Sequence, residues 1–315
     1  MSQLKDRVLF SSENSPAALV VGSVAFDKII TPTQRTERTL GGAASYASIA
    51  ASYYSPVRLV GVVGHDFDTE VIKRFERRKI DLEGLKRDDS GPTFFWSGQY
   101  SEGFSRRKTL ETHLNVFERF RPNLPVGYLD TRYILLGNID PDLQLHVLEQ
   151  LQGEFFSVAD SMDLWIDTKN KELRALIKQI DCLALNDTEA ILLTGERNLI
   201  KAGRKLLTMG PTMAIIKKGE HGAYLFHPEG LFALPSYPVT MVQDPTGAGD
   251  SFAGAFVGYL AAKDKTDFHS VKQAMIYAAV TASLTIEAFS CDALELAGAE
   301  EIEQRYIELV NIMRI

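Results

Sequence analysis

The fold of this chain is decided by one stretch of its sequence, Gln243-Asp244-Pro245-Thr246-Gly247-Ala248-Gly249-Asp250-Ser251-Phe252-Ala253-Gly254-Ala255-Phe256. Gly247, Ala248 and Gly249 precede residues 250–260, in which the large apolar side chains have helical spacing. The first peptide N–H groups of a helix have no partner within it, and the helix dipole adds positive charge there. The stretch therefore predicts a binding site for an anion such as phosphate at the start of a helix.

Asp250 stands in the first turn of that predicted helix. A carboxylate beside a bound phosphate repels it, so its presence needs a reason. Accepting a proton from an attacking hydroxyl group is such a reason. The alternative interpretation is that Asp250 only caps its helix. We expect a phosphoryl-transfer site with Asp250 as its catalytic base.

Three other motifs are excluded by single residues. A dinucleotide-binding GxGxxG motif would need glycine where Phe252 stands. A nucleophile elbow GxSxG would need glycine where Ala253 stands. A Walker A loop needs a Gly-Lys pair, which occurs nowhere in the sequence.

Around this stretch, apolar runs of strand length alternate with segments of helical spacing. Strands are expected at 17–24, 57–63, 133–136, 164–166, 182–185 and 214–217, with 223–226 completing a hairpin, and helices at 43–54, 68–79, 143–151, 173–180 and 191–194. The run 17–24 shows no polar alternation, as is typical of a strand buried on both faces. The pattern predicts an α/β fold with a mostly parallel central sheet and helices on both of its faces.

Two segments depart from this pattern. Residues 27–40 are rich in Thr and Arg, and residues 91–112 include the aromatic stretch Phe94-Phe95-Trp96. We expect them to form a small β lid projecting from the main sheet, with two surface loops as the alternative. No low-complexity linker divides the chain, so residues 1–315 are expected to form a single domain that carries this lid.

The composition narrows the choice of partners. The chain has 34 Lys and Arg against 41 Asp and Glu, a formal net charge of −7, which argues against a nucleic-acid partner. Its apolar runs are far shorter than the roughly 20 residues of a membrane span, so no membrane contact is expected. Residues 1–16 lack the apolar core of a signal peptide, which predicts a cytoplasmic protein.

Residues 244–256 (DPTGAGDSFAGAF) resemble the signature of the ribokinase-like (PfkB) carbohydrate kinase family, whose pattern is D-T-x-G-A-G-D. Further motifs follow in the family's order: GSVAFD at 22–27, LGG at 40–42, VGVVGHD at 60–66, LNDTE at 185–189 and IKKGEHGA at 216–223. The resemblance covers about residues 20–289. It implies a ribokinase-like fold and an ATP-dependent kinase that transfers the γ-phosphoryl group to a hydroxyl group of a sugar or nucleoside.

The resemblance also implies roles for the residues that match the acceptor side of the site. Asp250 is the base, and the N–H groups of Gly247, Ala248 and Gly249 form the anion hole for the γ-phosphoryl group. The substrate hydroxyl groups are held by Asp27, Gly41, Gly42 and Asn138. For Asp27, which follows the first predicted strand, an ordinary loop residue is the alternative.

On the nucleotide side, the resemblance implies a second set of roles. Asn186 and Glu189 match the family's Asn-x-x-Glu, which holds Mg²⁺ and phosphate, although the pair also fits a helix N-cap with its returning Glu. Lys217 or Lys218, with Gly219 and Gly222, match the nucleotide-binding loop, for which a solvated hairpin turn is the alternative. Asp244, with carbonyl groups near Phe289, is a candidate ligand of a monovalent cation. The expected cofactors are therefore ATP, Mg²⁺ and K⁺.

The sequence departs from the ribose-specific members of the family. They have Asn, Lys and Asn where this chain has Ala25, Ala43 and Tyr46. The loss of these polar contacts argues against ribose. Phe26, Tyr46 and the 94–96 strand are instead candidates for stacking on a less polar ring, such as the base of an adenosine-like nucleoside. The same aromatic residues also suit plain core or a homodimer interface formed by the lid.

Two interpretations from other classes remain. One is a non-catalytic sugar-binding protein that keeps the fold, against which the intact Asp250 counts. The other is an NAD-dependent oxidoreductase, against which the absence of GxGxxG after the first strand counts.

Overall fold

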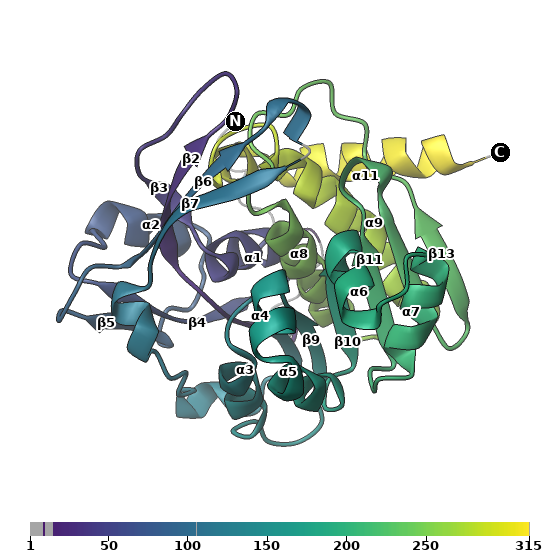
Figure 1. Ribbon diagram of the computed structural model, residues 1–315, viewed down its shortest axis with the longest axis horizontal. Helices are drawn as coiled ribbons and strands as arrows, with labels where there is room; N and C mark the ends of the chain where they lie inside the picture. Colours follow the sequence, from purple (N-terminus) through teal and green to yellow (C-terminus); the bar gives the residue numbers. More distant parts are fainter. Residues whose placement is uncertain (1–8, 10–14, 105, 315) are drawn as a thin grey trace.

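The computed structural model describes residues 9, 15–104 and 106–314, so most of the N-terminal stretch behind the predicted cytoplasmic location lies outside the described residues. Its larger sheet has nine strands in the order β13-β12-β11-β10-β9-β8-β1-β4-β5 (Figure 1). The strands are β1 (Ala18–Val21), β4 (Val57–Gly64), β5 (Leu85–Asp88), β8 (Tyr133–Leu136), β9 (Phe156–Asp160), β10 (Cys182–Asn186), β11 (Met213–Lys217), β12 (Ala223–His227) and β13 (Gly230–Leu234). Strands from β11 to β5 run parallel, and β12 and β13 add an antiparallel hairpin at one edge.

Helices cover both faces of this sheet, and each face has its own apolar core. One core includes side chains from α1 (Ala43–Ala51), α2 (Thr69–Arg77), α8 (Ala248–Lys263), α9 (Phe268–Thr285), α10 (Asp292–Leu296) and α11 (Ala299–Met313). The other includes side chains from α3 (Pro141–Leu148), α4 (Asp163–Thr168), α5 (Asn170–Ile177), α6 (Asp187–Thr194) and α7 (Leu199–Leu207). Alternate residues of each strand enter alternate cores, which explains why the strands are apolar throughout. The predicted fold class is confirmed.

A second sheet of four strands, in the order β3-β2-β6-β7, projects beside the first. Its strands are β2 (Ala25–Ile30), β3 (Thr39–Gly41), β6 (Phe94–Tyr100) and β7 (Arg107–His113), all from the two segments for which the sequence predicts a lid or its border. Figure 1 shows it at the upper left of the molecule, on the side of α1 and α2. Short 3-10 helices complete the described structure: η1 (Glu102–Phe104), η2 (Asn115–Arg119), η3 (Val126–Tyr128) and η4 (Gly219–His221).

Two of the predicted strands need correction. Residues 164–166 belong to α4, and the strand that the sequence pattern misses is β9, at Phe156–Asp160. A run of three apolar residues fits a strand or one helical turn equally well, so periodicity alone could not decide. The predicted strand 17–24 is also divided: β1 ends at Val21, and the chain turns at Gly22 and Ser23 to enter β2 of the small sheet.

Helices α1 and α8 pack close together where glycines of α8 face alanines of α1. A Cβ atom on Gly254 would lie 2.1 Å from the carbonyl oxygen of Ala47, and one on Gly258 would lie 2.7 Å from that of Ala51. Glycine is therefore required at both positions of α8. This contact holds the starts of the two helices, capped by Gly42 and Gly247, side by side.

Within the described residues, none of the helices is both long enough and apolar enough to span a lipid bilayer.

Candidate active site

The carboxyl ends of the parallel strands bring the predicted polar residues to one edge of the large sheet. Asp160, Asn186 and Lys217 are the last residues of the neighbouring strands β9, β10 and β11. Asn138 follows β8, and its Oδ1 accepts a hydrogen bond of 3.0 Å from Nε1 of Trp165. This edge is where open α/β sheets bind their ligands.

The start of α8 faces this edge and has the geometry of an anion site. Gly247 adopts a left-handed conformation with φ of 78° and caps the helix. Ala248 donates its amide to the carbonyl oxygen of Pro245 at 3.3 Å, whereas the amides of Gly247 and Gly249 have no acceptor among the described residues. Of the three N–H groups in the predicted anion hole, two are therefore free to bind a ligand, and that of Ala248 is already engaged.

Gly247 is required for a second reason. A Cβ atom there would lie 2.3 Å from the ring of Tyr46, which is only 1% exposed. Tyr46 thus packs beneath the anion-binding loop and presents no ring face to a substrate. Phe26 is also buried, between Phe67 at 5.5 Å and the guanidinium group of Arg38 at 3.8 Å. The prediction that Tyr46 and Phe26 are available for stacking is wrong, because the α1–α8 contact and the packing under the small sheet enclose them.

The side chain of Lys217 approaches the anion site from the end of β11. Its Nζ lies 2.7 Å from Oδ2 of Asp160, and it would lie 3.2 Å from a Cβ atom on Gly249. Burial disfavours the ammonium charge, but Asp160 and Glu189 overcome this effect and raise the pKa of Lys217. Of the two candidate lysines, Lys218 points elsewhere: its Nζ sits 3.7 Å from the ring centre of Tyr224.

Asp160 is a site residue that the sequence analysis missed. It ends β9, whereas the sequence pattern predicts a strand at residues 164–166, which belong to α4. A usable signal was present, since Phe156-Ser157-Val158-Ala159 is an apolar run followed at once by a carboxylate. The same sequence of apolar strand and polar end residue occurs at Asn186 and Lys217.

The carboxyl groups of this region have raised pKa values because they are buried near one another. Burial, followed by the charge of Asp160, raises the pKa of Asp250 to about 7. Burial, followed by the charges of Asp244 and Asp250, raises the pKa of Asp27 to about 8. Arg107 of the small sheet acts in the opposite direction on both groups. Arg107 is a second residue that sequence analysis missed, because nothing local to β7 indicates that it approaches Asp27 and Asp250.

Asp27 is held between the small sheet and the start of α1. Its carboxyl group folds across Gly41, where a Cβ atom would lie 2.1 Å from Cγ of Asp27. The next residue, Gly42, has φ of 90°, and a Cβ atom on it would lie 2.5 Å from the carbonyl oxygen of Ser23. The two glycines therefore bring the backbone close to a buried carboxyl group, whose two oxygens can form hydrogen bonds with two neighbouring hydroxyl groups.

Asn186 and Glu189 form the capping box that the sequence offers as one of their two roles. Oδ1 of Asn186 accepts from the Glu189 amide, and Oε2 of Glu189 accepts from the Asn186 amide, both at 2.8 Å. Glu189 is also near Asp160 and Lys217, and burial followed by the charge of Asp160 raises its pKa. The capping role is confirmed. With these hydrogen bonds made, the side chains of Asn186 and Glu189 still lie at the edge of the predicted phosphate site.

Asp244 has the features of a cation ligand. It is fully buried, and burial raises its pKa to about 6. Oδ1 accepts the amide of Thr246 at 2.9 Å, but Oδ2 is buried without a hydrogen-bond partner among the described residues. The backbone around Ile286 lies alongside, because the Gln243 amide donates to the Ile286 carbonyl at 2.8 Å. A buried, unpartnered carboxylate oxygen beside backbone carbonyl groups suits a hard cation.

The predicted nucleotide-binding loop forms a tight turn between β11 and β12. Gly219 and Gly222 both have positive φ values, 53° and 78°; Gly219 begins η4 and Gly222 follows it. A Cβ atom on Gly222 would lie 2.0 Å from the carbonyl oxygen of Leu234. The turn therefore depends on glycine at 222, where the backbone passes close to the end of β13.

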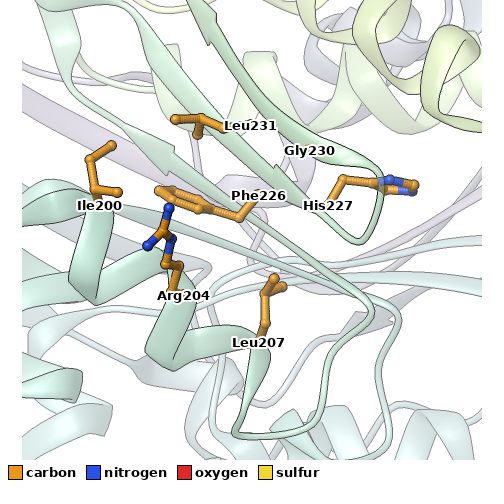
Figure 2. A pocket seen from close by; sticks show the side chains of 7 residues that line it. All are labelled: Ile200, Arg204, Leu207, Phe226, His227, Gly230 and Leu231. Atoms are coloured by element: carbon orange, nitrogen blue, oxygen red, sulfur yellow. The ribbon is translucent and has the colours of Figure 1, made fainter.

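A small cavity elsewhere in the molecule is separate from this site. It has a volume of about 170 Å³ and lies between α7 and the β12–β13 hairpin (Figure 2). Figure 2 shows Ile200, Arg204 and Leu207 on α7, with the ring of Phe226 lying toward Arg204. Helix α7 belongs to the face of the sheet opposite α8, so the cavity does not adjoin Asp250.

Known proteins resemble the chain at the levels of sequence and fold. Residues 132–296 match the model of the pfkB family carbohydrate kinases. The chain is 31% identical over 251 residues to the cytidine kinase of Thermococcus kodakarensis, a match that covers 76% of this chain and 87% of that protein.

Two solved structures illustrate the shared fold. A nucleoside kinase of Burkholderia thailandensis in complex with inosine superposes with a TM-score of 0.78 and 20% identity, covering 93% of this chain and 97% of that one. The ribokinase of Arabidopsis thaliana complexed with ribose and ATP gives a TM-score of 0.73 and 20% identity, covering 93% and 99%.

Proposed function

This chain belongs to the pfkB family of carbohydrate kinases, and we propose that it phosphorylates a ribose hydroxyl group of a nucleoside, with Asp250 as the base. It is a phosphotransferase that transfers a phosphoryl group from ATP to a hydroxyl group of a sugar or nucleoside. The observation that supports the role of Asp250 is its place in the first turn of α8, beside two free amides and the Lys217 ammonium group.

In the proposed reaction, Asp250 accepts the proton of the acceptor hydroxyl group as its oxygen attacks the γ-phosphorus atom of ATP. The bond between that phosphorus and the β–γ bridging oxygen breaks, and ADP leaves. The amides of Gly247 and Gly249 donate to the γ-phosphoryl oxygens, where negative charge develops. Asp27 and the backbone at Gly41 and Gly42 hold neighbouring hydroxyl groups of the acceptor. Asn138 is also proposed to hold an acceptor hydroxyl group.

Lys217 and the acidic residues near it suit the nucleotide. Lys217 stabilises phosphate charge, and Asp160 holds its ammonium group in place. Mg²⁺ bound with ATP would neutralise part of the charge on the β- and γ-phosphoryl groups. Glu189 and Asn186 are the proposed residues for holding it through water. Among the described residues there is no cluster of three or more His, Cys, Asp or Glu that could hold a metal.

The unpartnered Oδ2 of Asp244 supports a monovalent cation site next to the anion loop. Asp244 would hold the cation together with backbone carbonyl groups between Ile286 and Phe289. The midpoint temperature of thermal unfolding is expected to be higher in KCl than in choline chloride at equal ionic strength. In Asp244→Asn this difference should disappear, and an equal response of both proteins would contradict the site.

A homodimer through the small sheet is the proposed assembly. β7 is an edge strand of this sheet and is exposed along its length, with Leu110 40% exposed and Leu114, just after the strand, 42% exposed. An open edge of this kind can pair with a second copy. Sedimentation should show a dimer that Leu110→Glu converts to a monomer; a wild-type monomer at micromolar concentration would contradict the proposal.

A nucleoside is favoured over a free sugar by two findings. The cytidine kinase of Thermococcus kodakarensis is 31% identical to this chain, and the positions at which ribose-specific members have polar side chains are Ala25, Ala43 and Tyr46 here. ADP release from ATP and Mg²⁺ should be measured with nucleosides, pentoses, hexoses, sugar acids and polyols. Higher kcat/KM for at least one nucleoside than for any simple sugar is expected. Turnover confined to simple sugars would contradict the nucleoside assignment and leave the kinase assignment intact.

A further inference from the structure

The face of the small sheet that looks toward the site can be read from its register. Asp27 of β2 pairs with Trp96 of β6, and Tyr100 of β6 pairs with Arg107 of β7. Paired residues in neighbouring strands share a face, as do alternate residues along one strand. The pairing of β6 with β7 shifts register between Ser97 and Gly98, but the pairing of β6 with β2 is regular throughout. Asp27, Trp96, Tyr100 and Arg107 therefore lie on one face.

Contacts with the main body show that this is the face turned toward the anion loop. The hydroxyl group of Tyr100 lies 2.9 Å from Oγ1 of Thr246, two residues after Asp244 in the motif. The charge of Arg107 acts on both Asp27 and Asp250. Trp96 lies on the same face, beside Asp27, with which it pairs. We therefore place Trp96 in the wall of the acceptor site.

The indole ring of Trp96 is held flat against the sheet. A Cβ atom on Gly98 would lie 2.1 Å from Cη2 of the ring, so the ring crosses the space that a side chain at 98 would fill. Nε1 donates to Oγ1 of Thr109 at 3.3 Å, which fixes the ring across β6 and β7. The ring packs on the backbone at Gly98, and the guanidinium carbon of Arg107 lies over the ring, 5.5 Å from its centre. Trp96 as a whole is half-buried rather than enclosed.

The other aromatic residues for which the sequence suggests stacking are already engaged. Tyr46 packs against Gly247, and Phe26 against Phe67. Phe94 stacks on Phe117 with ring centres 5.4 Å apart, and Phe95, on the opposite face of β6, contacts His113 at 6.0 Å. Among the described members of this aromatic set, Trp96 is the one on the site-facing side of the sheet whose ring has no aromatic partner, because only the Arg107 guanidinium group lies over it.

We propose that Trp96 is the platform on which the heterocyclic base of the nucleoside stacks while Asp27 holds its ribose. This inference rests on the nucleoside assignment and names the residue that recognises the base. Every base has a flat π-face, so a fixed indole ring accepts purines and pyrimidines alike. A free pentose has no such ring and gains nothing from Trp96, which makes this residue a determinant of nucleoside over sugar.

The test compares Trp96→Leu with the matched variant Phe95→Leu, which removes an aromatic ring from the other face of the same strand. Trp96→Leu is expected to raise KM for the best nucleoside at least about fivefold, the lower end of the range for loss of one base–aromatic stack. KM for ATP and for any accepted pentose should stay unchanged. Trp96→Phe keeps an aromatic face and should retain most of the affinity, and Phe95→Leu should leave the nucleoside KM as it is.

A direct binding measurement guards against misfolding of the variants. The chain has two tryptophans, Trp96 and Trp165. Quenching of the emission by a saturating nucleoside should be strong in the wild type and clearly weaker in Trp96→Phe, in which Trp165, bonded to Asn138, is the one tryptophan left, while calorimetry still detects binding to that variant. Unchanged nucleoside KM in a folded Trp96→Leu protein, or equal quenching in Trp96→Phe, would overturn the proposal.

Failure of the nucleoside assignment can be distinguished from failure of the Trp96 proposal. If no nucleoside is a substrate, the nucleoside assignment itself fails, whatever Trp96 does. If sugar acids are preferred and Arg107→Gln abolishes that preference, recognition of a carboxylate by Arg107 replaces stacking on Trp96, and the inference is overturned.

Discussion

Nζ of Lys217 lies 2.7 Å from Oδ2 of Asp160, and the pair bridges the end of β10 at the carboxyl edge of the sheet. Both side chains are largely buried, at 15% and 9% exposure. Above them the backbone of Gly249 leaves room for the ammonium group, which any side chain at 249 would meet. The ion pair thus joins the strand edge to the anion loop and sets the charge that Asp250 experiences.

Removing the Lys217 charge should impair catalysis far more than removing that of its neighbour. Lys217→Met is expected to lower kcat by about 10²-fold or more, the scale for loss of one group that stabilises transition-state charge. Lys218→Met is the matched control, because Lys218 lies over Tyr224 and should leave kcat unchanged. Steady-state kinetics with saturating ATP separates the two. Equal effects of both substitutions would show that Lys217 has no special role.

The pH dependence should follow the titration of Asp250. A base must be deprotonated to act, so kcat/KM is expected to rise with pH through about 7, the raised pKa of Asp250. Asp160→Asn removes a charge that raises this pKa and should move the acidic limb to lower pH. Lys217→Met removes a charge that lowers it and should move the limb to higher pH. Shifts in the same direction for both variants would contradict this electrostatic assignment.

Stability of the free protein should decrease as the pH rises into the range in which the buried carboxyl groups ionise. Asp27 and Asp250 have folded-state pKa values of about 8 and about 7, above the unfolded value of 3.8. For a raised pKa, the stabilisation is complete below the unfolded value and is lost as pH rises through the folded value. Asp250→Asn should therefore unfold at a higher temperature than the wild type at pH 8, and the gap should close near pH 4. Thermal unfolding across this range is the measurement, and a gap that widens toward low pH would refute the prediction.

The Gly41 backbone should matter only through Asp27. A Cβ atom on Gly41 would displace the Asp27 carboxyl group, so Gly41→Ala is expected to raise KM for the acceptor about fivefold or more, as loss of a hydrogen bond implies, with little change in KM for ATP. Gly127→Ala is the control, because a Cβ atom there has nothing within 4 Å. A rise in KM for ATP instead would mean that the substitution disturbs the α1–α8 contact rather than Asp27.

The sequence was sufficient to predict those features of the site that depend on residues close together in the chain. The small residues 247–249 before a run with helical spacing predict the free amides at the start of α8, and the polar residues that end apolar runs predict the sheet edge at Asn186 and Lys217. The capping box follows from the Asn186–Glu189 spacing alone. In each case the deciding interactions lie within one turn or one strand of the residues that signal them.

Residues whose position depends on distant packing could not be predicted in this way. Asp160 was missed because the short run Phe156–Ala159 was not recognised as a strand. The burial of Tyr46 depends on Gly254, more than 200 residues away in the chain, which brings α8 against α1. Arg107 approaches Asp27 and Asp250 only because β7 pairs beside β6 in a separate sheet.

The most direct test of the central claim is single-turnover phosphoryl transfer by Asp250→Asn, with the best acceptor from the substrate panel and saturating ATP and Mg²⁺. We predict that the rate of transfer falls by about 10²- to 10⁴-fold, the range for loss of a general base, while calorimetry shows that ATP and acceptor still bind. A transfer rate within a few-fold of the wild type, in a folded protein that binds both substrates, would contradict the assignment of Asp250 as the base.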